Sequence, residues 1–167
     1  MSDHPEAWLR GPLPGIAPVF LPVAHSLIQA REDVAKLAPT ISNDVLWARV
    51  GAASAGFHLL HLAGALDRLF TYARGESLSD EQKAAIRAES VDHPSLDGIA
   101  LTAHVTSAVE HALAQLKDTD PSTYLDERKI GRAGLPATVL GCLFHAAEHT
   151  ARHAGQFVTT IKIAGAR

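Results

Sequence analysis

The stretch LFHAAEHTARHAGQFVT, residues 143–159, indicates how this chain folds and where its chemistry lies. It contains no proline and only one late glycine, so it favours a single continuous helix. Three histidines in it, His145, His149 and His153, are spaced by four and therefore lie one above another on one helix face. Two neutral imidazoles with this spacing can both reach one divalent ion. A further ligand must then come from another segment.

The two sides of this histidine stripe differ in character. At about 100° per residue, the apolar side chains of the helix fill the arc beyond His153, which must face the core. Glu148 and Arg152 fall on the other side, four residues apart and opposite in charge, so we predict that they form a solvated ion pair. His149 and His153 should therefore point further inward than His145.

A second predicted helix carries the candidates for the further ligand. One stripe of that helix contains polar and small side chains: Ser54, His58, His61, Ala65, Arg68 and Tyr72. His58 and His61 can both point inward. Helical geometry does not choose between them.

The rest of the chain is also typical of helices. Alanine and leucine dominate the long segments, and β-branched residues do not cluster into alternating runs, so we predict no strand. Four long helices and a short one in a connection favour an all-α fold, an antiparallel-type four-helix bundle with long up-down helices. We expect one domain over residues 1–167, with 1–17 as a proline-rich lead-in. The expected helices run from Pro18 or Pro22 to just before Pro39, from Ser42 to Arg74 with Gly75 as the stop, over Ser79–Glu89, from Ser95 or Asp97 to Asp120, and from about Pro136 onward.

Composition narrows the classes of function. Lys and Arg number 15 against 18 Asp and Glu, a formal charge of -3, which argues against nucleic acid or an anionic membrane as a partner. The charge-free stretch Val50–Leu66 includes three glycines and two histidines, so we predict a buried bundle helix there rather than a membrane span. The single cysteine, Cys142, fits a reducing compartment and should be a buried small side chain. With no signal peptide recognisable near Met1, we expect a cytoplasmic protein.

Two segments together carry a family resemblance. HLLHLAGALDR, residues 58–68, followed far along the chain by HAAEHTARHAGQ, residues 145–156, resembles the DinB superfamily. The resemblance implies a four-helix bundle that holds a divalent metal through three histidines, one from the second helix and two spaced by four on the fourth. In the family pattern the last ligand precedes x-Gly-Gln, which is His153 here, and its partner is His149. The ligand on the second helix is followed by Leu-Ala, which selects His61 over His58.

Three histidine ligands leave an open coordination position, which is how a catalytic site differs from a closed structural one. Zn²⁺ or Ni²⁺ suits this set, with either an activated water or a metal-held thiolate at the open position. Family relatives include S-transferases and isomerases that use low-molecular-weight thiols. The resemblance therefore suggests a thiol-dependent S-transferase or a hydrolase of a small molecule. The alternative is a metal-binding bundle without catalysis.

Other residues have open roles. His58 and His145 are either supporting or pocket residues or plain hydrogen-bonded histidines of the core. Arg68 and Tyr72 could bind a carboxylate on the substrate, although a salt bridge at the rim is an equal alternative for Arg68. A histidine that binds a metal through one ring nitrogen usually donates a hydrogen bond from the N–H of the other. The candidate acceptors are Ser54, Glu148, Tyr72 or backbone carbonyls. His104 and His111 should be solvated.

The fourth helix is apolar over more of its surface than one bundle seam requires. The excess lies at Leu140, Phe144 and Val158, away from His149 and His153. We therefore expect a two-fold homodimer. Otherwise the proline-rich lead-in must cover these side chains.

Overall fold

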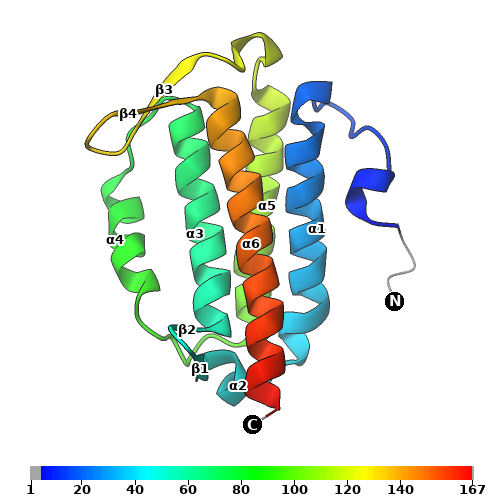
Figure 1. The fold of residues 1–167 in the computed structure, drawn as a ribbon, viewed down its shortest axis with the longest axis vertical. Coiled ribbons are helices and arrows are strands. Elements are labelled where there is room, and N and C mark those ends of the chain that lie inside the picture. Colours follow the sequence, from blue (N-terminus) through cyan, green and yellow to red (C-terminus); the bar gives the residue numbers. More distant parts are fainter. Residues whose placement is uncertain (1–4, 167) are drawn as a thin grey trace.

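Four long helices pack side by side around one apolar core (Figure 1). The computed structural model describes residues 5–166. The predicted all-α four-helix bundle is confirmed, and its members are α1 (Leu21–Leu37), α3 (Ala55–Ala73), α5 (Gly98–Asp118) and α6 (Val139–Gly165). Four single 3-10 turns accompany them: Ala7–Leu9, Pro18–Phe20, Ala38–Thr40 and Pro121–Thr123. The lead-in predicted over 1–17 is described from residue 5 onward, and its first four residues lie outside the described part.

Each long helix has two neighbours. α6 packs between α1 and α3, and α5 contacts both α1 and α3 on the other side. α3 and α6 run antiparallel, whereas α3 and α5 run parallel, because the short helix α4 (Asp80–Glu89) carries the chain back along the outside of α3 (Figure 1). The short helix that the sequence predicts over Ser79–Glu89 thus determines the direction of α5.

The helix starts at α4 and α5 agree with the sequence. Ser79 caps α4 in a capping box with Gln82, each side chain accepting a hydrogen bond from the other's backbone N–H. Asp97 caps α5 by accepting from the backbone N–H of Ala100 at 2.8 Å. Both caps satisfy N–H groups that the first helical turn leaves free.

The predicted second helix, Ser42–Arg74, is wrong in its first third. The segment forms a one-turn helix α2 (Asn43–Trp47) before α3 begins. A short hairpin follows α2, with strands of two residues each, β1 (Arg49–Val50) and β2 (Ala53–Ser54). Gly51 occupies the turn with φ +67°, a conformation that favours glycine. Ser54 then accepts a hydrogen bond from the N–H of Phe57 at 3.2 Å and starts α3.

The second correction concerns the segment before α6. The segment between the helix predicted to end at Asp120 and the one predicted to begin near Pro136 contains a hairpin, β3 (Glu127–Ile130) paired with β4 (Leu135–Thr138), so the prediction of no strand is also wrong. Pro136 lies in β4 rather than in the first turn of the helix. Thr138 is the cap instead, accepting from the N–H of Gly141 at 3.0 Å.

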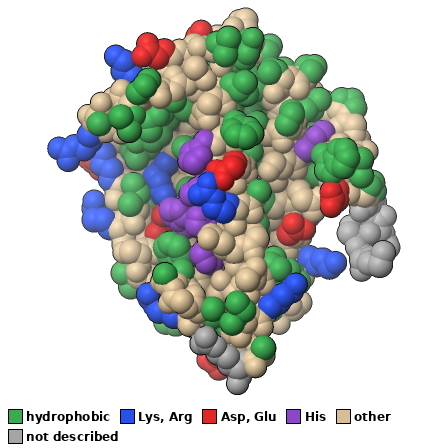
Figure 2. All heavy atoms as spheres, viewed as in Figure 1, with side chains coloured by type: hydrophobic (Ala, Val, Ile, Leu, Met, Phe, Trp, Pro, Cys, Tyr) green, Lys and Arg blue, Asp and Glu red, His purple; other side chains and the backbone are tan. Residues whose placement is uncertain are grey.

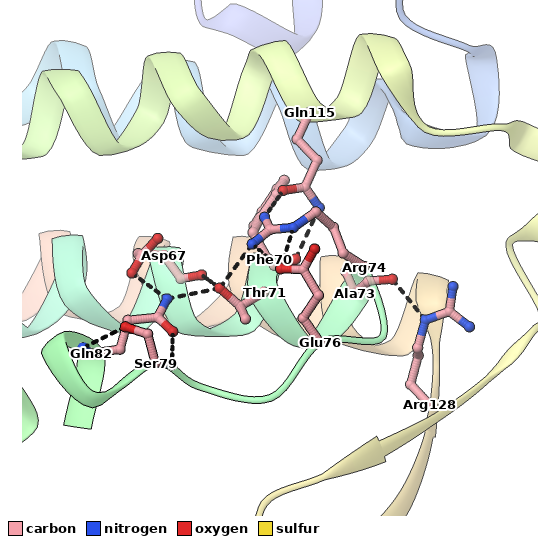
Figure 3. A network of polar contacts seen from close by, with 10 residues as sticks. All are labelled: Asp67, Phe70, Thr71, Ala73, Arg74, Glu76, Ser79, Gln82, Gln115 and Arg128. Atoms are coloured by element: carbon pink, nitrogen blue, oxygen red, sulfur yellow. Dashed lines mark hydrogen bonds and ion pairs between the residues drawn. The ribbon is translucent and has the colours of Figure 1, made fainter.

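A polar network anchors the carboxyl end of α3 to three other elements (Figure 3). Gln82 of α4 donates to the Thr71 hydroxyl at 2.8 Å, and Arg128 of β3 donates to the carbonyl of Ala73 at 2.7 Å. The Gln115 side chain of α5 donates to a backbone carbonyl near the same helix end at 2.9 Å. These bonds hold in place the helix that carries His58 and His61.

Among residues 5–166, no helix is long and apolar enough to cross a membrane.

Candidate metal site

Three imidazoles from two helices meet on one face of the bundle. One ring nitrogen from each of His61 on α3, and His149 and His153 on α6, lies within 4.8 Å of the others. Histidine side chains gather over α3 and α6 on the face drawn in Figure 2. Because the two helices run antiparallel, His61 lies opposite His149 and His58 lies opposite His153.

The contacts within this cluster are close. His149 Nε2 lies 3.0 Å from His61 Nε2. The ring centroid of His153 lies 4.6 Å from that of His61 and 4.5 Å from that of His149. The i, i+4 spacing brings the two α6 rings together, and the packing of α3 against α6 adds the third.

His58 takes a different position from His61. Its side chain is buried one turn earlier on α3, and its Nδ1 lies 3.1 Å from His153 Nδ1. It contacts His153 through that nitrogen and is not one of the three residues whose ring nitrogens converge.

His145 lies outside the cluster on the exposed side of α6. Its side chain is 53% exposed, and its Nδ1 is 3.4 Å from a carboxylate oxygen of Glu148. Glu148 also accepts hydrogen bonds from Arg152, which is the surface ion pair that the helical spacing predicts.

Glu89, the last residue of α4, is the contact of His61 that the sequence analysis missed. Its Oε2 lies 2.8 Å from His61 Nδ1. Arg68 donates to both oxygens of the same carboxylate, one of them at 3.1 Å. Ser54 and Glu148, both considered for this place, are engaged elsewhere, Ser54 as the cap of α3 and Glu148 with Arg152.

Gly64 is the signal that could have pointed to this contact. It lies on α3 between His61 and Arg68, and a Cβ there would collide with the Glu89 carboxylate and the Arg68 guanidinium. A glycine inside a long helix costs stability relative to alanine, so its presence suggests that something approaches the backbone closely.

The two other predicted pocket residues have separate surroundings. Arg68 forms a salt bridge with Glu89, but its side chain is only 11% exposed, so the pair is nearly buried rather than at the rim. Tyr72 packs partly buried against the core. It follows His61 by eleven residues, a helical rise of about 16 Å, so the structure does not bring it to the cluster.

Comparison with known proteins identifies the family. The family model of the DinB superfamily matches residues 26–157, which is most of the chain. The chain belongs to the DinB superfamily. A solved structure described as the conserved protein of locus from Enterococcus faecalis superposes with a TM-score of 0.68 at 16% identity, over 90% of this chain and 99% of that one, and so shares the fold. No curated protein matches the sequence.

Electrostatics favour the neutral form of two imidazoles of this DinB-superfamily cluster, those of His149 and His153. Burial, reinforced by the neighbouring histidines, lowers the pKa of His153 to about 3. Burial also lowers the pKa of His58 and of His149, each with a contribution from His61. Burial alone would raise the pKa of Glu89, but its hydrogen bonds from His61 and Arg68 outweigh that effect and the pKa is lowered. The cluster therefore combines neutral imidazoles on α6 with a buried carboxylate anion, that of Glu89, beside His61.

The donor set fits a divalent transition ion. Two nitrogens bound tetrahedrally to zinc lie about 3.3 Å apart, close to the separation of the Nε2 atoms of His61 and His149. His149 Nδ1 is buried without a hydrogen-bond partner among the described residues. Neutral imidazoles from two helices are ligands that Zn²⁺ and Ni²⁺ accept readily.

A cavity lies on another side of α3. It has a volume of about 660 Å³ between α3, α4 and α5, and Glu89 and Gly64 border it. His104 and His111 are exposed on α5 and line it. Cys142 is buried as expected, and burial raises the pKa of its thiol.

Proposed function

We propose that this chain binds one divalent transition ion, Zn²⁺ or Ni²⁺, through His61, His149 and His153. The observation that carries the proposal is the convergence of three histidine ring nitrogens from two helices within 4.8 Å. Three protein ligands leave a position open for a ligand from solution.

We further propose that the site serves an enzyme acting on a small molecule, either a thiol-dependent S-transferase or a hydrolase. When bound, the ion would lower the pKa of a water or a thiol in the open position. A hydrolase would also use a general base close to that position. The two nearby carboxylates are both committed, Glu89 to Arg68 and His61, and Glu148 to Arg152. This favours the transferase, because a coordinated thiolate is already deprotonated.

The second candidate function is a metal-binding bundle without catalysis. The same commitment of Glu89 and Glu148 favours it, since neither of these two carboxylates is free to move a proton. In that case the ion would only tie α3 to α6.

Metal analysis tests the first proposal. Purified protein loaded with Zn²⁺ and then desalted should retain about one ion per chain. His61→Ala, His149→Ala and His153→Ala should each retain little, whereas His104→Ala and His111→Ala should match the wild type. Equal metal content in all six proteins would refute the site.

A thiol titration tests the S-transferase against the hydrolase and the bundle without catalysis. In the Co²⁺ or Ni²⁺ form, a low-molecular-weight thiol should produce a sulfur-to-metal charge-transfer band that His61→Ala does not show. If the spectrum of the metal-loaded protein does not change with any thiol, the result would favour hydrolysis or a purely structural ion.

We also propose a homodimer in a reducing, cytoplasmic setting. Phe144 is 66% exposed on α6, whereas Val158 borders a cavity that Trp8 of the lead-in also lines. Phe144 is thus the part of the excess apolar surface that remains for a partner subunit. Light scattering of a species near the monomer mass of 17.7 kDa at micromolar concentration would refute the dimer.

A further inference from the structure

We infer that Glu89 is a positioning residue for the cluster: it holds His61 in one tautomer and one ring orientation, so that the Nε2 lone pair faces His149 and His153. The inference rests on the proposed metal site for its purpose. Its geometry stands independently of any ion.

The hydrogen-bonding roles follow from the chemistry of the two groups. An ionised carboxylate only accepts hydrogen bonds, so the proton of a neutral His61 must be on Nδ1, 2.8 Å from Glu89 Oε2. The other nitrogen, Nε2, then carries the lone pair. That atom is the one 3.0 Å from His149 Nε2.

Glu89 is itself held rigidly. Arg68 donates to both of its oxygens, and the side chains of Glu89 and Arg68 are only 9% and 11% exposed. Gly64 leaves the space through which the pair crosses α3. His61 and Arg68 are seven residues apart, two helical turns, so both reach the same carboxylate from one face of α3.

The position of Glu89 in α4 is not explained by the stability of that helix. Glu89 is the only buried residue of α4, whose apolar side chains, such as Ile86, remain exposed. A negative charge at the carboxyl end of a helix opposes the helix dipole. α4 therefore docks on α3 through polar contacts: Gln82 donates to Thr71 near its amino end, and the buried carboxylate of Glu89 contacts a candidate ligand, His61, at its carboxyl end.

Imidazole NMR of the metal-free protein tests the tautomer directly. We expect ¹⁵N–¹H spectra at neutral pH to show His61, assigned with His61→Ala, protonated on Nδ1. In Glu89→Ala the ring should move toward the Nε2–H form that free histidine prefers. In Glu148→Gln, which alters a nearby carboxylate that contacts neither His61 nor His153, the spectrum of His61 should not change. An Nε2–H tautomer in the wild type, or an unchanged Nδ1–H tautomer in Glu89→Ala, would overturn the inference.

Metal affinity supplies the second readout. Competition with a chromophoric chelator should show Zn²⁺ bound about 10- to 100-fold more weakly by Glu89→Ala, and less weakened by Glu89→Gln, which keeps an acceptor oxygen. Glu148→Gln should stay within about twofold of the wild type, since its ion pair is on the surface. A Glu89→Ala affinity equal to that of the wild type would overturn the positioning role.

Two further outcomes remain decisive. If Glu89→Ala does not fold, as judged by circular dichroism, Glu89→Gln takes its place: a partial tautomer shift with weaker Zn²⁺ binding supports the role, and no change in either overturns it. If the wild type binds no Zn²⁺, the proposed function fails, while the NMR result still decides whether Glu89 fixes the tautomer.

Discussion

The two helices of the site support their imidazoles in different ways. On α3, His61 faces a buried carboxylate that is itself held by Arg68. On α6, His153 has only a neutral ring, that of His58, beside its Nδ1, and the corresponding nitrogen of His149 has no partner among the described residues. The imidazole on α3 thus contacts a charged group, whereas the α6 pair is brought together by helical spacing and packing. The same residue type in one cluster thus depends on different kinds of support.

The largest expected effect separates His61 from His58. Replacing His61 by alanine should abolish retention of Zn²⁺, because it removes one of three ligands. Replacing His58 should keep the stoichiometry and weaken affinity about tenfold, because it removes only the ring behind His153. Chelator competition on both variants makes the comparison. If the His58 variant loses Zn²⁺ and the His61 variant retains it, the ligand from α3 is His58 instead.

A second prediction concerns the Arg68–Glu89 pair beside His61 on α3. Arg68→Met leaves the Glu89 carboxylate buried without its cation, so the free energy of unfolding should fall by about 3 kcal/mol. Urea unfolding of the metal-free protein measures it. The double variant Arg68→Met, Glu89→Gln should recover part of the loss, since it removes the uncompensated charge. A single variant as stable as the wild type would mean that the pair contributes nothing to the fold.

The α6 side should dominate the pH dependence. The pKa of His153 is lowered from 6.5 to about 3, and that of His149 is lowered too, both first by burial. Below pH 6.5 the unfolded chain binds protons that the folded chain does not, until the pH approaches the lowered values. The contribution of these histidines to the free energy of unfolding should therefore be fully present above pH 6.5 and should decline as the pH falls toward 3. The lowered pKa of Glu89 adds to the loss only in the acid range where carboxyl groups titrate.

Urea midpoints of the metal-free protein between about pH 7.5 and pH 5 isolate the histidine contribution. Replacing His153 by glutamine should flatten the decline, whereas the same change at the exposed His104 should not. An unchanged slope in the His153 variant would contradict the assignment.

The smallest effect belongs to the surface pair on α6. Glu148→Gln removes the ion pair with Arg152, whose side chain is 50% exposed. Exposed pairs contribute little, so the thermal midpoint should stay within the error of the measurement. A clear drop would show that Glu148 supports the α6 histidines much as Glu89 supports His61.

The sequence by itself determined the features that depend on local geometry. The i, i+4 spacing of His149 and His153, their inward lean and the Glu148–Arg152 pair follow from the helical repeat alone. Capping residues likewise predicted the starts of α4 and α5, because a cap acts within a few residues of itself. Helical periodicity could not choose between His58 and His61, and the family pattern made that choice.

Only the tertiary structure decided which distant groups meet. Glu89 lies 28 residues from His61, and the contact exists because α4 turns back along α3 and makes α5 parallel to it. No local preference records that direction, since a connection of this length can place a short helix in several ways. The hairpin at Gly51 was hidden for a related reason: two strands of two residues are too short for an alternating pattern, and their pairing depends on the turn and its surroundings.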